Sequence, residues 1–271
     1  MQNQEIVKII DNLKGRRGYE EKRASKLGFS SLYAYFEDKI SKKQKTIEDE
    51  KKELEAAKIE NQPKTNKKSE IKSHNDLMRF CNNVGLNPAK LITINQIHSR
   101  NVIAPKNPGN YDSSDGIINF GGDLVCSIKV ADCLPIFFVN NISKTIGLVH
   151  AGWRGLSSGI IEEYINKMKL NGESAIDNYV FIGPSIQKCC FKIQNDVLGK
   201  FDPTFVSRLD EIHYKVDLQN WAMSQLLKLN INKNKVFISN NCTYCFEEKY
   251  DSFRREGPNA GRMYAVLGWK A

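Results

Sequence analysis

The most constraining stretch of this 271-residue sequence is IGLVHAGWRGL, at residues 146–156. It begins as an apolar, strand-forming run, reaches His150, and then places two glycines, a tryptophan and an arginine within four residues. Glycine is favoured where the backbone needs unusual dihedral angles or where another group approaches it closely, and an adjacent arginine favours an anionic group. The pattern predicts a buried strand that ends at an anion-binding turn, formed by Gly152 and Arg154, before a helix that starts near Ser157.

The chain from about residue 74 onward has the pattern of a compact mixed α/β domain. Apolar, β-rich runs predict strands, and apolar residues at helical spacing predict the helices between them. The predicted strands cover residues 91–94, 125–130, 136–139, 145–149, 179–182, 236–239 and 264–267, and the predicted helices cover residues 75–84, 157–170 and 218–229.

The first 73 residues differ in character from the rest. Residues 41–58 are nearly all Lys, Glu, Gln and Ala, which is typical of a charged helix, and residues 61–66 resemble a linker. We therefore predict two parts, a charged helical extension with a linker over 1–73 and a mixed α/β domain over 74–271. Ile40, Ile47 and Leu54 are spaced seven apart, a thin coiled-coil seam through which the protein could form a homodimer.

The net charge of +9 does not point to a nucleic-acid partner, because much of the excess lies in the first quarter, where lysines alternate with glutamates. We interpret it as a solvated lysine-rich surface. No apolar run of about 18 residues and no signal-peptide pattern occurs, so we expect neither a membrane protein nor a secreted one, and place the chain in the cytoplasm.

The seven cysteines are odd in number and scattered through apolar segments, which favours thiols over a disulfide framework. Cys242 and Cys245 have CxxC spacing, which could indicate metal or redox chemistry, but no second CxxC accompanies them. We interpret this pair as structural.

Three potential metal ligands share one property. His98, Cys133 and His150 each lie at or just beyond the end of a predicted strand, where loops present side chains to a cleft. Two imidazoles and one thiolate suit zinc, and three protein ligands leave one tetrahedral position open, as in catalytic sites. The wide spacing alone is also compatible with a buried thiol and two hydrogen-bonded histidines.

Arginines and glycines gather just before the last predicted strand, in SFRREG at 252–257 and AGRM at 260–263. Arg254, Arg255 and Arg262 could be surface charges, or they could join Arg154 in a clamp for phosphate or carboxylate.

Taken together, the motifs NQIHS, SSDG, VADCLPIFF, VHAGWRGL, IGPSIQKCCFKI, NCTY and FRRE…AGRM resemble the YfiH/laccase-domain family. Its members were once described as polyphenol oxidases and are now regarded as zinc-dependent purine nucleoside phosphorylases. The resemblance covers about residues 75–271. It implies a layered α/β/β/α architecture, and it implies that His98, Cys133 and His150 match the family's metal ligands.

The resemblance also implies a reaction, the phosphorolysis of adenosine or inosine to the free base and ribose-1-phosphate, with adenosine deamination as a companion activity. Purine nucleoside and phosphate are then the partners. Asp115 and Asp132, inside matching motifs, are the candidate catalytic carboxylates, and Arg154 is the third candidate catalytic residue. Gly152, Arg154 and the three C-terminal arginines are the candidate phosphate-binding residues. Zinc is favoured over copper, because multicopper oxidation needs many more than the four histidines of this chain.

Two departures from the family pattern accompany this resemblance. The first 70 or so residues lack the family's usual strand-rich start, and Asp76 stands where an arginine is common. Two alternatives therefore stay open: a hydrolase of the same family that edits cell-wall precursors, and a non-catalytic interaction protein that uses its N-terminal helix.

Overall fold

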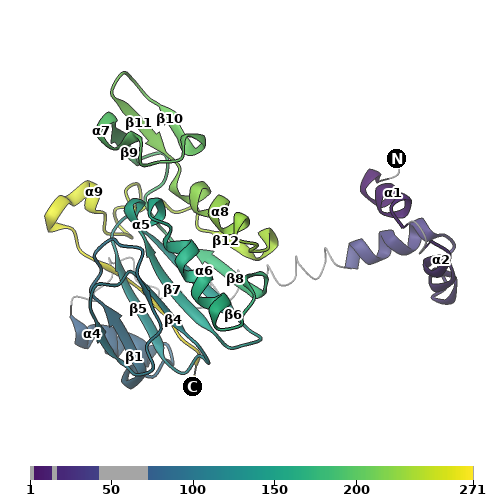
Figure 1. The fold of residues 1–271 in the computed structure, drawn as a ribbon, viewed down its shortest axis with the longest axis horizontal. Helices are drawn as coiled ribbons and strands as arrows, with labels where there is room; N and C mark the ends of the chain where they lie inside the picture. Colours follow the sequence, from purple (N-terminus) through teal and green to yellow (C-terminus); the bar gives the residue numbers. More distant parts are fainter. Residues whose placement is uncertain (1–2, 14–16, 43–72, 271) are drawn as a thin grey trace. The chain divides into compact units, whose positions relative to one another are not determined.

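The structure is a computed structural model that describes residues 3–13, 17–42 and 73–270 (Figure 1). The chain divides into two compact units, Met1–Thr65 and Asn66–Ala271. The predicted linker over 61–66, most of the charged helix over 41–58, and Ile47 and Leu54 of the coiled-coil seam lie outside the described residues. The predicted boundary at 73/74 and the homodimer stay predictions.

The smaller unit has its own apolar cluster. It contains α1 (Gln4–Asp11), α2 (Arg17–Lys26) and a helical stretch over residues 32–42. Ile6, Ala24, Tyr35 and Phe36 are buried together, so the apolar residues of these helices pack inside this unit.

Three sheets form the larger unit. The first has four strands, in the order β13 (Met263–Leu267), β5 (Val125–Val130), β1 (Leu91–Ile94) and β3 (Gly109–Tyr111). The second has six, in the order β12 (Val236–Ile238), β8 (Asn178–Ile182), β6 (Leu134–Asn140), β7 (Ile146–Ala151), β4 (Gly116–Asn119) and β2 (Val102–Ile103). The third is small, with β10 (Val206–Arg208), β11 (His213–Val216) and β9 (Lys192–Gln194).

The two larger sheets stack face to face between layers of helices. Ile92 and Ile128 of the four-stranded sheet share one buried cluster with Ile117 and Leu148 of the six-stranded sheet. The outer face of the four-stranded sheet is covered by α4 (His74–Asn83), and that of the six-stranded sheet by α6 (Ile160–Leu170) and α8 (Leu218–Lys228). The expected α/β/β/α architecture is confirmed.

The strand β7 lies inside these layers, and all six of its residues are buried. It pairs antiparallel with β6 on one side and β4 on the other. Both of its faces are covered, which explains why its sequence is apolar from Ile146 to Val149 rather than alternating.

The turn after β7 differs from the prediction of one helix starting near Ser157. A short helix, α5 (Trp153–Ser157), begins directly after Gly152. Gly159 then adopts a left-handed φ of 84°, and α6 starts as a separate helix at Ile160. Glycine tolerates this conformation, so the break between α5 and α6 falls at a glycine.

Several short strands were not predicted from the sequence. These are β2, β3 and β4 before the centre of the chain and β9, β10 and β11 after it, with two to four residues each. Strands of this length give too few residues for a period-two pattern. Among the described residues, no helix is long and apolar enough to cross a membrane.

The contact between β7 and α6 generates a stability prediction at Gly147. A Cβ at this position would overlap the ring of Tyr164, which is fully buried and stacks on Phe138 with ring centroids 4.0 Å apart. We expect Gly147→Ala to lower the free energy of unfolding by about 3 kcal/mol, because the enclosed ring cannot move aside. Urea denaturation measures this.

Gly199→Ala is the matched control, since a Cβ there meets nothing within 4 Å. Equal unfolding free energies for the two variants would show that the sheet and helix pack more loosely here than the structure indicates.

Candidate metal centre

Three elements bring His98, Cys133 and His150 together. His98 lies in the loop after β1, Cys133 directly precedes β6, and His150 lies in β7. The antiparallel register pairs Pro135 with His150, so Cys133 is at the same end of the sheet as His150. One ligand atom from each of the three residues lies within 4.8 Å of the other two. The set that the sequence suggested is therefore a spatial cluster.

The close approach of these side chains depends on Gly152. A Cβ at this position would meet the Cys133 Sγ at 3.0 Å and the His98 Cδ2 at 3.1 Å. The backbone φ of Gly152 is −68°, which any residue can adopt. The first glycine of the HAGWRG motif is thus needed for space rather than for backbone freedom.

A buried carboxylate organises two of the three ligands. Asp115 is fully buried, and its Oδ1 lies 2.8 Å from the Nδ1 of His150. Its oxygens also accept hydrogen bonds from the backbone N–H groups of His98 at 3.0 Å and Ser99 at 2.6 Å, and from the Ser99 hydroxyl at 2.8 Å. With Nδ1 engaged by Asp115, the Nε2 of His150 is the nitrogen available to a metal.

Asp132, the residue before Cys133, is held from the opposite side. Its backbone is left-handed, with a φ of 87°. Its carboxylate accepts hydrogen bonds from the Thr243 hydroxyl at 2.6 Å and from the backbone N–H of Arg254 at 2.7 Å. Both predicted catalytic aspartates therefore have their oxygens engaged inside the protein.

The charges of the three ligands are coupled. Burial would raise the pKa of Cys133, but His150 and His98 outweigh it and lower that pKa to about 6. Burial would likewise lower the pKa of His150, but the Cys133 thiolate and Asp115 raise it to about 9. The pKa of Asp115 is lowered: burial opposes this, and hydrogen bonds from His150 and Ser99 prevail. The site carries a thiolate, the form of cysteine that binds metals.

The predicted phosphate-binding arginines fall into two groups. Arg154 is exposed, and its guanidinium stacks 4.4 Å from the Trp153 ring centroid. Arg254 stacks on Phe191 at 5.1 Å and donates to the carbonyl of Lys192. Because Trp153 and Phe191 both pack against Phe201, these two arginines border one aromatic cluster.

The other two arginines bind the protein's own backbone. Arg255 donates hydrogen bonds to the carbonyls of Thr243, Tyr244 and Tyr250. Arg262 donates to the carbonyls of Ala260 and Gly261. In this structure, the guanidinium groups of Arg255 and Arg262 stabilise loops.

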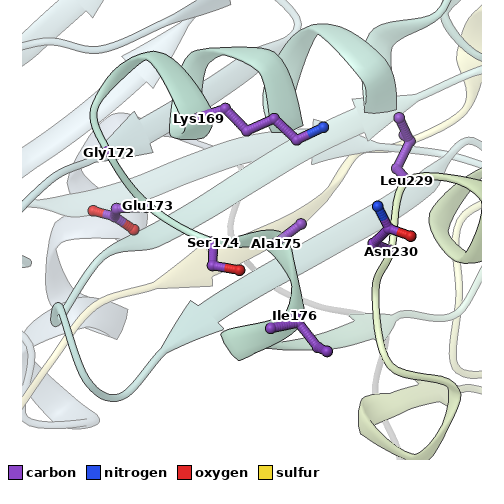
Figure 2. Close-up of a pocket in the computed structure, with 8 residues that line it drawn as sticks. All are labelled: Lys169, Gly172, Glu173, Ser174, Ala175, Ile176, Leu229 and Asn230. Atoms are coloured by element: carbon purple, nitrogen blue, oxygen red, sulfur yellow. The ribbon is translucent and has the colours of Figure 1, made fainter.

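A hollow of about 370 Å³ lies elsewhere, where α6 ends (Figure 2). Lys169, Glu173 and Asn230 line it with five other residues, and no histidine or cysteine is among them. This hollow is therefore separate from the metal centre, which lies near the start of the α5–α6 segment.

A second group of thiols was missed by the sequence analysis. Cys189 and Cys190 lie beside Cys242 and Cys245, with all four sulfurs within 4.8 Å of one another. The CxxC pattern does not reveal this group, because the two cysteines beside Cys242 and Cys245 are adjacent to each other in the sequence.

Comparison with known proteins agrees with this architecture. The family described as multi-copper polyphenol oxidoreductase laccase matches residues 61–270. A purine nucleoside phosphorylase of Clostridium acetobutylicum is 33% identical over 168 residues, which cover 58% of this chain and 70% of that protein. One of Haemophilus influenzae is 30% identical over 74% of this chain and 82% of its own length.

Among solved structures, the crystal structure of YlmD from Geobacillus stearothermophilus aligns with a TM-score of 0.69. The alignment has 25% identity and covers 73% of this chain and 82% of that one.

The position of Asp115 predicts a loss of metal affinity in Asp115→Asn. The amide would turn a donor toward backbone N–H groups and would remove the charge beside His150, so we expect affinity at this site to fall about 10–100-fold. Titration with cobalt(II) measures this affinity. The signal is the part of the cobalt absorption that is lost in Cys133→Ser. Asp123→Asn, which changes an exposed carboxylate paired with Lys90, should bind as the wild type does. Unchanged affinity in Asp115→Asn would contradict an orienting role.

The charges of Cys133 and His150 predict how metal binding depends on pH. A bound ion requires the thiolate and the neutral imidazole. With pKa values of about 6 for Cys133 and about 9 for His150, one proton must leave His150 between these values. We therefore expect the apparent affinity to rise about tenfold per pH unit from about pH 6 to 9, and more steeply below pH 6. Competition with a chelator across this range tests it, and a flat profile would refute it.

Proposed function

Because the chain belongs to the family described as multi-copper polyphenol oxidoreductase laccase, and curated relatives are named purine nucleoside phosphorylases, we propose that it is a metal-dependent purine nucleoside phosphorylase. Its substrates are then a purine nucleoside such as adenosine or inosine, and phosphate. The observation that carries the proposal is the convergence of His98, Cys133 and His150 around one point.

The residues of this centre fit a divalent ion. The Cys133 sulfur is held as a thiolate, the His150 Nδ1 is occupied by Asp115, and Gly152 leaves the space between the ligands clear. Two imidazoles, one thiolate and an open fourth position suit zinc in a catalytic site. We propose zinc rather than copper, because only two of the chain's four histidines are in this cluster and multicopper oxidation needs many more.

When bound, such an ion supplies Lewis-acid chemistry, polarising a substrate oxygen or lowering the pKa of a water molecule. The chain's own residues have separate tasks in the proposal. Arg154 provides an exposed cation two residues from Gly152, and Arg254 provides a second at the same aromatic cluster. We assign both to phosphate, since a guanidinium matches its oxygens in a fork geometry.

We assign Asp115 and Asp132 positioning roles. Asp115 orients His150 and the His98 loop, and Asp132 holds the backbone next to Cys133. Adenosine deamination would need a further acid–base group beside the ion. Because the oxygens of both aspartates already accept internal hydrogen bonds, phosphorolysis is the reaction that the site supports best.

The reaction is a substitution at the sugar. An oxygen of hydrogen phosphate bonds to C1′ of the ribose, the bond from C1′ to the purine nitrogen breaks, and the leaving purine takes up the proton that the hydrogen phosphate loses. Positive charge develops on the sugar during this step, and the anionic phosphate, held by arginine, lies where it stabilises that charge.

The proposal predicts phosphate-dependent conversion of inosine to hypoxanthine and ribose-1-phosphate. We expect Cys133→Ala to lower kcat/KM at least about 100-fold, because it removes one of three metal ligands. Product chromatography with and without phosphate measures this. Cys81→Ala, which changes a buried cysteine packed between α4 and the four-stranded sheet, should stay active.

The alternatives are separated by their substrates. A precursor-editing hydrolase would leave inosine unchanged and would hydrolyse a cell-wall precursor without consuming phosphate. A folded, zinc-loaded sample that converts no nucleoside would overturn the proposal, and one that also hydrolyses no precursor would favour an interaction protein that uses its N-terminal unit.

A further inference from the structure

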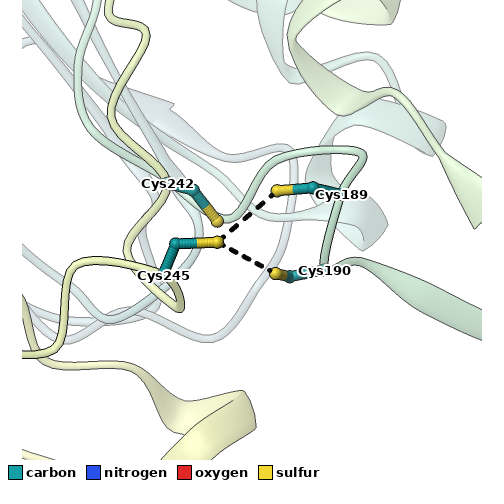
Figure 3. Close-up of side chains that lie close together, drawn as sticks. All are labelled: Cys189, Cys190, Cys242 and Cys245. Carbon is teal, nitrogen blue, oxygen red and sulfur yellow. Dashed lines mark hydrogen bonds between the residues drawn. The ribbon is translucent and has the colours of Figure 1, made fainter.

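The four thiols that lie away from the metal centre are brought together by two parallel strands. The strands β8 and β12 are parallel neighbours, with Ile182 paired to Ile238, so the loops that follow them leave the same edge of the sheet. The loop after β8 carries Cys189 and Cys190, and the loop after β12 carries Cys242 and Cys245. Figure 3 shows all four side chains directed toward one point.

Hydrogen bonds within the protein join the two loops that carry the four cysteines. A bridge pairs Ser185 with Cys242, and the backbone N–H of Thr243 donates to the carbonyl of Ser185 at 3.2 Å. The Gln187 side chain donates to the carbonyl of Ser239 at 3.1 Å. The cluster is therefore built on a fixed frame.

We propose that Cys189, Cys190, Cys242 and Cys245 bind one zinc ion in a closed tetrathiolate site, separate from the His98–Cys133–His150 centre. All four sulfurs lie within 4.8 Å of one another. A tetrahedral site with Zn–S bonds of about 2.3 Å places its sulfurs about 3.8 Å apart. The Cys245 sulfur lies 3.7 Å from that of Cys189 and 3.3 Å from that of Cys190. The 3.3 Å separation would lengthen slightly, and the remaining separations are already within 4.8 Å, about 1 Å of the tetrahedral value.

The surroundings of Cys242 are those of a thiolate ligand. The backbone N–H of Gln187 donates to its sulfur at 3.4 Å. The backbone N–H groups of Cys245 and Tyr244 also donate to this sulfur. Backbone N–H groups of a CxxC turn that point at the first sulfur favour the form that binds a metal.

The remaining thiols show why a cation belongs here. The Cys245 sulfur is in contact with those of both Cys189 and Cys190. Four thiolates cannot coexist at this spacing without a positive charge between them, and a divalent ion supplies it. Arg255, which donates to the carbonyls of Thr243 and Tyr244 inside the CxxC turn, adds a further cation against the loop.

A disulfide is the competing explanation, and the distances oppose it. Bonded sulfurs lie about 2.05 Å apart, whereas the Cys245 sulfur lies 3.3 Å from that of Cys190 and 3.7 Å from that of Cys189. All four residues are free thiols in the structure.

The tetrathiolate site would also support the first metal centre. Thr243, between Cys242 and Cys245, donates its hydroxyl to Asp132, the neighbour of Cys133. The carbonyl of Asp132 accepts from the N–H of Ile186, in the loop that leads to Cys189. An ion that fixes both cysteine loops therefore fixes two of the groups that hold Asp132.

The test counts metal ions in the full-length protein, independently of enzymatic activity. Reduced, metal-free protein is loaded with zinc, freed of excess, and analysed by elemental mass spectrometry. We expect two zinc ions per chain in the wild type, one in Cys242→Ser/Cys245→Ser, one in His98→Ala/His150→Ala, and two in the control Cys81→Ala. The melting temperature should fall by roughly 5 °C or more when the second site is lost, because a bound ion stabilises the folded state.

Cobalt(II) separates the two sites without relying on any one variant folding. The His98→Ala/His150→Ala protein should keep the intense thiolate-to-cobalt absorption of a four-sulfur site, while Cys242→Ser/Cys245→Ser should show only the weaker band of a one-thiolate site. One zinc per wild-type chain, lost with His98 and His150, would overturn the proposal. So would a disulfide within the cluster, mapped by peptide mass spectrometry in protein isolated without added oxidant.

Discussion

The geometry of the metal centre depends on the buried carboxylate of Asp115. A carboxylate with no exposure to water is tolerated only when hydrogen bonds surround it. Asp115 obtains them from the His150 ring and from the backbone of His98 and Ser99. The loop turns back on itself to supply these donors, with His98 at a left-handed φ of 59°. The requirement to satisfy one buried charge thus fixes the ring of one ligand and the backbone of another.

Much of the larger unit could be predicted from sequence, because its main strands and helices carry strong local patterns. The long β6 and β7 runs are continuously apolar, and α6 buries Ile160, Ile161, Ile165 and Met168 on the stripe that the periodicity indicated. The short strands could not be predicted, since two to four residues, as in β2 and β4, take their conformation from neighbours distant in the chain. The break at Gly159 was missed for a related reason: a glycine inside a helical pattern does not reveal its own φ.

The site was predicted unevenly, for reasons that differ from residue to residue. His98, Cys133 and His150 lie at or just beyond the ends of predicted strands, where loops could present them to one cleft. The sequence could not show that Asp115 and Asp132 use their oxygens internally, because their donors come from His150, Thr243 and the backbone of distant segments. The cysteine cluster was missed because its members meet only through the parallel pairing of β8 with β12, a non-local contact.

The two thiol-containing clusters differ in the number of ligands that the protein supplies, and this difference separates their roles. His98, Cys133 and His150 could provide three donors to an ion and would leave a coordination position open, whereas four cysteines would fill a tetrahedral shell and leave none. A closed shell contributes to folding, and an open shell contributes chemistry. Asp132 accepts a hydrogen bond from the hydroxyl of Thr243, which lies between Cys242 and Cys245, and it directly precedes Cys133. A rigid closed site at the cysteine loops would therefore limit the motion of Cys133, a ligand of the open site. Gly152 contributes at the open site itself. Because it has no side chain, it leaves room for Cys133 and His98 to approach each other.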